Sequence, residues 1–217
     1  MFYKFMSYVI KFLIWILNGN VDVQNKEVLK DKTYIFVGPH RTWWDPIFTA
    51  YAVWPLRLSF MTKKELFDNF FIRFILVHVN AFPVDRKNPK PSVIKVPVKN
   101  LKSGQLSLLM YPSGTRYSES MKGGVALIDK MTKSEIIPVV YQGPVTFKGL
   151  LKRQRITIRF GEALDVDYSI KDFKEFSADL DQKMQKSFAE IDQKIDPNFK
   201  YIPNEDKLEL EKKKGHI

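Results

Sequence analysis

The chain has 217 residues, of which 45% are hydrophobic, enough for one sizeable core and too few for two comfortable domains. It contains no cysteine, which excludes disulfides, thiolate metal sites and a cysteine nucleophile. The 35 basic residues outnumber the 24 acidic ones, and the net charge of +11 predicts an anionic partner: lipid headgroups, nucleic acid or a phosphorylated small molecule.

The first expected element is a helix over residues 1–17, which is apolar apart from a few residues. It is shorter than the ~20 apolar residues of a transmembrane helix, and no small-residue cleavage site follows it. Lys4 and Lys11 with Ser7 and Tyr8 between them give one polar edge and a broad apolar face. All four tryptophans lie in the first quarter of the chain, which favours a membrane interface over a nucleic-acid groove. We expect an interfacial anchor; a helix packed on the domain's own core is the alternative.

Further along the chain, short apolar runs typical of strands alternate with helix-like segments. Such runs, apolar on both faces, indicate a mostly parallel sheet covered by helices. Pro97 argues against the third of the covering helices. The expected strands are residues 34–38, 58–62, 76–84, 106–111, 136–141 and 155–160, and the expected covering helices are 45–54, 64–75, 92–102 and 123–133.

Apolar residues at spacings of three and four from Ile170 to Ile195 predict a long amphipathic helix, with Ser169 as its N-cap. After Pro197 the chain is polar and charged. The predicted fold is therefore a single α/β domain over residues 33–196. A membrane-interface helix and connector (1–32) precede it, and a loosely ordered, charged tail (197–217) follows it.

His40 and Asp45 follow the first predicted strand and lie between Pro39 and Pro46. On a continuous helix, residues five apart point ~140° away from each other, so these two can pair only if the chain turns. Asp45 and Pro46 also fit the N-cap and first position of the next helix. The two interpretations are compatible, because an N-cap aspartate can also hold the tautomer of His40 and stabilise its imidazolium.

Two arginines follow later apolar strands. Arg86 and Arg116 each lie in a turn at the end of a predicted strand, where ligands bind in α/β sheets. Together they can hold one phosphate bidentately. Singly, each fits a solvated surface charge, with Asp85 and Arg86 as a local pair.

Four blocks occur in order: His-x4-Asp at 40–45, Phe-Pro-Val-Asp-Arg at 82–86, Pro-x-Gly-Thr-Arg at 112–116 and Ile-Pro-Val at 137–139. Shorter matches lie at 63–66, 122–124 and 160–162. This pattern resembles the glycerolipid acyltransferase family, and within it the bacterial 1-acyl-glycerol-3-phosphate acyltransferases. The resemblance extends from about residue 37 to residue 164, and four ordered blocks rarely arise by chance.

The resemblance implies that His40 and Asp45 form a catalytic dyad and that residues 137–139 border the acyl site. The family usually has Glu at the position of Ser113, and Gly is more usual at the position of Asn80. The residues that the resemblance assigns to substrate binding are Arg86, Ser113, Gly114, Thr115, Arg116, Lys63 and Lys122.

The implied reaction transfers a fatty-acyl group from a thioester of acyl carrier protein or coenzyme A to the sn-2 hydroxyl of 1-acyl-glycerol-3-phosphate, giving phosphatidic acid. His40 would accept the hydroxyl proton, and backbone N–H groups after His40 or in the 113–114 loop would stabilise the oxyanion. The mechanism needs no metal or other cofactor. The expected partners are the thioester donor, a lysophospholipid acceptor and an anionic membrane, not nucleic acid. The expected location is the cytoplasmic face of the cell membrane.

A basic cluster, Lys148, Lys152, Arg153 and Arg155, suits donor phosphates or an acidic carrier protein, or is a solvated loop. Three alternative functions remain: acylation of another lysolipid, a lipid hydrolase with Ser113 as nucleophile, and a non-enzymatic basic protein. The hydrolase lacks the Gly-x-Ser-x-Gly elbow. The non-enzymatic protein leaves the four blocks as coincidence. A metallohydrolase is disfavoured, since the three histidines show no His-Glu-x-x-His spacing.

Overall fold

A seven-stranded sheet in the order β1-β7-β6-β2-β5-β3-β4 forms the centre of the protein. The computed structural model describes residues 2–85, 88, 90–114, 121 and 123–200. Strands β6 and β7 pair antiparallel, and every other neighbouring pair is parallel, which confirms the predicted α/β class. The strands are β1 Asp22–Gln24, β2 Ile35–Val37, β3 Leu58–Lys63, β4 Ala81–Val84, β5 Ser107–Met110, β6 Ile136–Gln142 and β7 Thr157–Phe160.

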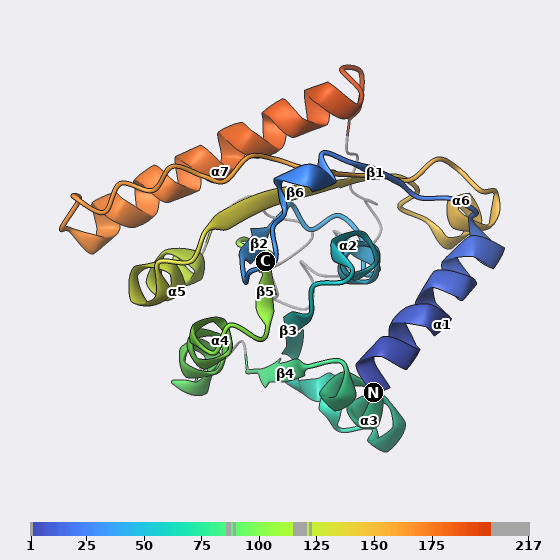
Figure 1. The fold of residues 1–217 in the computed structure, drawn as a ribbon, viewed down its shortest axis with the longest axis horizontal. Helices are drawn as coiled ribbons and strands as arrows, with labels where there is room; N and C mark the ends of the chain where they lie inside the picture. The colour runs from blue at the N-terminus through green and yellow to red at the C-terminus, as the bar shows by residue number, and fades with distance from the viewer. Residues whose placement is uncertain (1, 86–87, 89, 115–120, 122, 201–217) are drawn as a thin grey trace, which may run out of the picture.

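The central strands are apolar on both sides because helices cover both faces of the sheet (Figure 1). Successive residues of β2 point to opposite faces: Phe36 packs into the core on the side of α1 and α2, and Ile35 and Val37 pack on the side of α4, α5 and α7. All three are fully buried. The helices are α1 Phe2–Leu17, α2 Asp45–Val53, α3 Phe70–His78, α4 Ser92–Lys102, α5 Gly124–Thr132, α6 Phe147–Leu151 and α7 Phe173–Ile195, with 3-10 turns η1 Lys26–Val28 and η2 Lys64–Phe67.

The segment from residue 64 to residue 84 differs from its prediction. The expected helix at 64–75 is divided into η2 and α3, and the expected strand at 76–84 is reduced to β4. Asn69 causes the division, because its side chain accepts hydrogen bonds from the backbone N–H groups of Phe71 and Ile72 and so starts α3. Asn80, at φ 65°, then reverses the chain into β4. Glycine occupies this left-handed conformation most easily and asparagine tolerates it, which accounts for Asn80 where the family usually has Gly.

The expected helix at 92–102 is confirmed as α4, although Pro97 lies inside it. Its buried neighbours Val98 and Leu101 pack in the core and offset the lost backbone hydrogen bond. The expected N-cap of α7 is wrong. Asp172, not Ser169, caps α7 by accepting from the Glu175 N–H at 2.8 Å. The predicted charged tail lies outside the described residues from residue 201 onward.

Candidate active site

The turn after β2 begins at a close approach between two strands. A Cβ on Gly38 would lie 2.3 Å from the carbonyl oxygen of Val139 in β6, so glycine is required there. The chain then turns through residues 39–44 before α2 begins. His40 is thereby placed at the carboxyl end of β2, the end of a parallel strand at which α/β proteins bind ligands.

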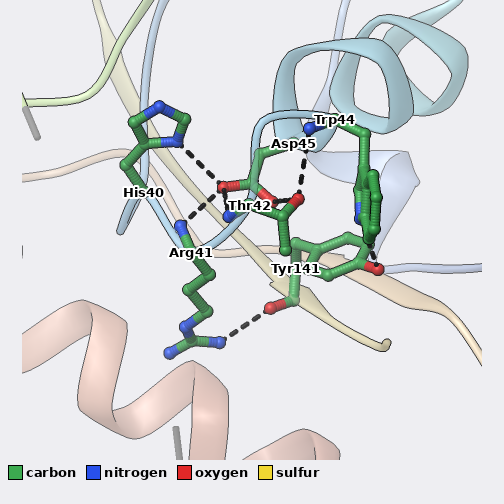
Figure 2. Close-up of polar contacts among 6 residues, drawn as sticks. All are labelled: His40, Arg41, Thr42, Trp44, Asp45 and Tyr141. Carbon is green, nitrogen blue, oxygen red and sulfur yellow. Dashed lines mark hydrogen bonds and ion pairs between the residues drawn. The ribbon is translucent and has the colours of Figure 1, made fainter. Parts of the chain in front are cut away.

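The chain turns between His40 and Asp45, and this turn brings the two side chains together. Figure 2 shows Asp45 with its carboxylate directed at the turn: Oδ2 lies 3.0 Å from His40 Nδ1. A carboxylate only accepts hydrogen bonds, so in the neutral imidazole Nδ1 carries the proton and Nε2 keeps its lone pair. Nε2 lies on the side of the ring away from Asp45 (Figure 2). His40 therefore has the tautomer of a general base.

The Asp45 carboxylate is almost completely buried and accepts hydrogen bonds from the turn itself. Oδ2 also accepts from the N–H groups of Arg41 at 2.6 Å and Thr42 at 2.9 Å, and Oδ1 accepts from the Thr42 hydroxyl at 2.7 Å. Asp45 is the first residue of α2, and no side-chain bond caps that helix. The expected role of Asp45 as N-cap is therefore wrong: its carboxylate organises the turn before it.

Some of the backbone N–H groups that the sequence analysis suggested as oxyanion donors already donate hydrogen bonds within the protein. The N–H groups of Arg41 and Thr42 donate to Asp45, and that of Gly114 donates to the Tyr111 carbonyl at 2.8 Å. Three of the donors that the sequence suggested are thus engaged within the protein.

Tyr111, which follows β5, supports the histidine ring. The two rings are stacked, with centroids 4.3 Å apart and an angle of 18° between their planes. Burial, together with the negative charge of Asp45, raises the pKa of Tyr111 well above its usual value, so the phenol stays neutral. The sequence interpretation missed this residue, although its place between a strand and Pro112 was a usable signal.

His40 lines a cavity of about 1100 Å³ that extends under several helices. The wall is mostly apolar, with Asp85 and Lys90 among its charged residues. A cavity of this size and lining suits a long hydrocarbon chain with a polar end. Apolar wall residues come from six helices: Met6 and Ile10 in α1, Ile47 in α2, Leu76 in α3, Ile94 in α4, Leu127 in α5 and Phe173 in α7.

Arg41 ties this turn to the C-terminal helix. Its guanidinium binds both carboxylate oxygens of Asp192 in α7, with Nη1 2.9 Å from Oδ1, and Nη1 also donates to the Tyr141 carbonyl at 2.7 Å. Gln142 Nε2 donates to the same Asp192 oxygen, Oδ1, at 2.7 Å. The Arg41 side chain is only 8% exposed, so this bidentate pair holds a charge that is largely removed from water.

We expect Asp192→Ala to lower the free energy of unfolding by about 3 kcal/mol, because it leaves the buried Arg41 without its carboxylate. Asp179→Ala is the matched control: Asp179 pairs with Lys183 on the same helix, both side chains are about one-third exposed, and the substitution should cost less than ~1 kcal/mol. Urea denaturation measures both. Equal small losses would show that the Arg41–Asp192 pair does not brace the turn.

The predicted substrate-binding residues are only partly described. Arg86, Thr115, Arg116 and Lys122 lie outside the described residues. Gly114 lines the cavity, in the left-handed conformation at φ 66°. Ser113 is buried and is not part of the wall. Lys63 is the last residue of β3, and its Nζ lies 3.7 Å from Glu65 Oε1. It is likewise not part of the wall.

Two other groups of residues from the sequence analysis lie away from the cavity wall. Residues 137–139 are buried inside β6 and are not part of the wall. The basic cluster lies on and after α6, where Arg155 pairs with Asp22 at 2.8 Å. None of its four residues lines the cavity.

Comparisons with known proteins find a matching family model and named relatives. A family model described as "Acyltransferase" matches residues 20–142. The chain is 42% identical to a 1-acyl-sn-glycerol-3-phosphate acyltransferase of Streptococcus pneumoniae, over 89% of this chain and 74% of that protein. It is 38% identical to the protein of the same name from Bacillus subtilis, over 89% of this chain and 98% of that protein.

A solved structure shares the fold. The 1-acyl-sn-glycerophosphate acyltransferase of Thermotoga maritima matches with a TM-score of 0.65, over 88% of this chain and 79% of that one. At 17% sequence identity, this likeness concerns the fold alone. Of the helices that the structure describes, none is long and apolar enough to cross a bilayer.

Proposed function

Because this chain belongs to the Acyltransferase family and is an O-acyltransferase, we propose that it acylates the sn-2 hydroxyl of 1-acyl-glycerol-3-phosphate to give phosphatidic acid. The acyl donor is a thioester of acyl carrier protein or coenzyme A. The observation that carries the proposal is the His40–Asp45 pair at the wall of a large apolar cavity. The choice of acceptor rests on the names of the two bacterial relatives.

In this proposal His40 Nε2 accepts the proton of the acceptor hydroxyl while the oxygen attacks the thioester carbonyl. The imidazolium that forms is stabilised by the Asp45 carboxylate at 3.0 Å. Collapse of the tetrahedral intermediate breaks the carbon–sulfur bond, and the proton held by His40 neutralises the leaving thiolate. The sequence of steps contains no covalent acyl-enzyme.

The most direct test is incubation of the purified protein with labelled acyl thioester and a panel of lysolipids that differ in headgroup. Diacyl product from 1-acyl-glycerol-3-phosphate, at a kcat/KM well above that for the other acceptors, supports the proposal. Preference for another lysolipid would leave the acyl transfer intact and overturn the assigned acceptor. Thioester hydrolysis without acceptor product would favour a hydrolase.

Ser113→Ala separates acyl transfer from the Ser113-dependent hydrolase. Ser113 is buried between Pro112 and Gly114, which both line the cavity, so its replacement should change kcat less than about threefold and act chiefly on the acceptor KM through this part of the wall. Steady-state kinetics with varied acceptor measure this. Loss of all turnover with acceptor binding preserved would instead identify Ser113 as the nucleophile.

We also propose that α1 attaches the enzyme to the cytoplasmic face of the membrane. The proposal is supported by the two sides of the helix: Ile14 is buried in the core and Met6 and Ile10 line the cavity, while the opposite side is exposed and mostly apolar. Phe12 is 59% and Trp15 61% exposed. Such a helix can bury its outer side in the headgroup region while its inner side stays on the domain.

Replacing Phe12 and Trp15 with serine should weaken binding to anionic vesicles by about tenfold or more and slow acylation of bilayer-bound acceptor. Acylation of a short-chain, water-soluble acceptor should be unchanged. Deletion of residues 1–17 would also open the cavity, so the surface substitutions are the cleaner test. Added salt should weaken binding only in part, since the apolar contribution is unscreened. Unchanged vesicle binding would make α1 an ordinary packing helix.

A further inference from the structure

Helix α3 is apolar apart from Arg73 and His78, and none of its residues is buried. Phe70 and Phe71 are 75% and 76% exposed, and Ile72, Phe74 and Val77 are exposed as well. A helix with so few polar residues is normally enclosed by protein or by lipid. Monomeric soluble proteins rarely leave such a continuous apolar surface in water.

Helix α6 carries a second exposed apolar group. Phe147 is 57% and Leu151 52% exposed, while Leu150 between them is buried and anchors the helix in the core. Lys148 and Lys152 are exposed beside them. The short helix therefore presents a mixed apolar and basic surface, unlike the outer surface of a typical solvent-facing helix.

Helix α1 connects these two surfaces. At its N-terminal end, residues of α1 and α3 line the same cavity. At its C-terminal end, Asn18 Nδ2 donates to the Leu150 carbonyl at 3.3 Å, and Arg153 donates to the Ile16 carbonyl at 3.0 Å. Figure 1 shows α3, α1 and α6 in succession along one side of the molecule. We call the exposed apolar residues of these three helices the apolar belt.

We propose that the whole apolar belt, not α1 alone, lies on the surface of an anionic phospholipid bilayer, with α3 and α6 inserting phenylalanines on either side of α1. The proposal rests on the proposed function, which gives the enzyme a lipid acceptor. Residues of α1, residues of α3 and His40 line one cavity, so the proposed bilayer contact lies next to the space that would hold the acyl chain.

The charges of the belt favour lipid over a protein partner. None of the helices α1, α3 and α6 contains an aspartate or a glutamate, whereas each contains at least one lysine or arginine, such as Lys11, Arg73 and Lys148. Basic side chains at the edge of an apolar surface bind anionic headgroups as the apolar residues enter the interface. The basic cluster around α6 thus gains a role in the bilayer contact, at a distance from the cavity.

Two double variants test the belt with α1 left intact: Phe70→Ser with Phe71→Ser in α3, and Phe147→Ser with Leu151→Ser in α6. None of the four residues lines the cavity. The matched control is Met131→Ser, at a hydrophobic residue that is 47% exposed on α5, on the other face of the sheet. Flotation with vesicles of phosphatidylcholine and phosphatidylglycerol gives the partition coefficient of each protein, and thermal melting confirms that each is folded.

Each double variant should lower the partition coefficient by about tenfold or more, while the control binds as the wild type does. Acylation of a short-chain, water-soluble acceptor should stay within about twofold of wild type, because the cavity wall is unchanged.

Wild-type vesicle binding by folded α3 and α6 variants overturns the proposal. So does a wild-type dimer that both variants dissociate, seen by light scattering, because the belt is then a subunit interface. A failure of the proposed function appears separately, as a wild-type enzyme that binds vesicles but does not acylate the acceptor.

Discussion

His40→Ala is expected to lower kcat for acyl transfer by about 10²–10⁴-fold, the contribution of a positioned general base. The side chain is 17% exposed at the cavity wall, and its main packing contact is the stack against Tyr111. The substitution should therefore leave the melting temperature nearly unchanged. Acceptor KM should change little, because the imidazole acts on a proton and not on the lipid chain.

The measurement is steady-state acyl transfer, together with thermal melting of the same preparation. His78→Ala is the matched control: His78 lies on α3, is exposed and does not line the cavity. It should retain wild-type turnover on a water-soluble acceptor. A His40→Ala enzyme with wild-type turnover and normal melting would remove the basis for the dyad.

Replacement of Asp45 should have two effects that different substitutions separate. In Asp45→Asn, the amide oxygen can take the place of Oδ2 and accept from His40, Arg41 and Thr42, while the amide NH₂ donates to the Thr42 hydroxyl. This variant keeps the turn and loses the negative charge. We expect kcat to fall by about 10–10²-fold, less than in His40→Ala, with little loss of stability.

Asp45→Ala removes the acceptor altogether. The N–H groups of Arg41 and Thr42 then lose their partner in a buried turn, at a cost of about 1–3 kcal/mol each in the free energy of unfolding. Urea denaturation should therefore rank the variants Asp45→Asn above Asp45→Ala in stability, whereas His40→Ala stays close to wild type. An Asn variant that is as inactive as His40→Ala, with a lowered melting temperature, would make Asp45 mainly a brace of the turn.

Much of the fold follows from local pattern. The runs at 34–38, 106–111 and 136–141 are apolar on both faces, and the structure places them in the central strands, enclosed by helices on both sides. The spacing of three and four from Ile170 onward gives α7, since a 3.6-residue period can bury one face of a helix. The His40–Asp45 motif could be recognised because its residues are close in sequence and lie between prolines that favour a turn.

Other features depended on partners distant in the chain. Strand β1 is too short and polar to be predicted from its own residues. It forms because it pairs with β7, more than 130 residues later. The expected strand at 76–84 contains an apolar run that suits a strand or a helix equally, and the cap at Asn69 decided between them. The bidentate pair of Arg41 with Asp192 joins residues 151 positions apart.

The sequence by itself determined the α/β class, the position of the long final helix and the identity of the His-Asp pair, because each rests on residue types at short, regular spacing. Only the tertiary structure decided that Asp45 faces back into its turn, that Tyr111 stacks on His40 and that α1 walls the cavity while its outer side stays exposed. These features arise where separate segments meet in space. Side-chain direction and burial at such meetings depend on long-range packing, which no local periodicity records.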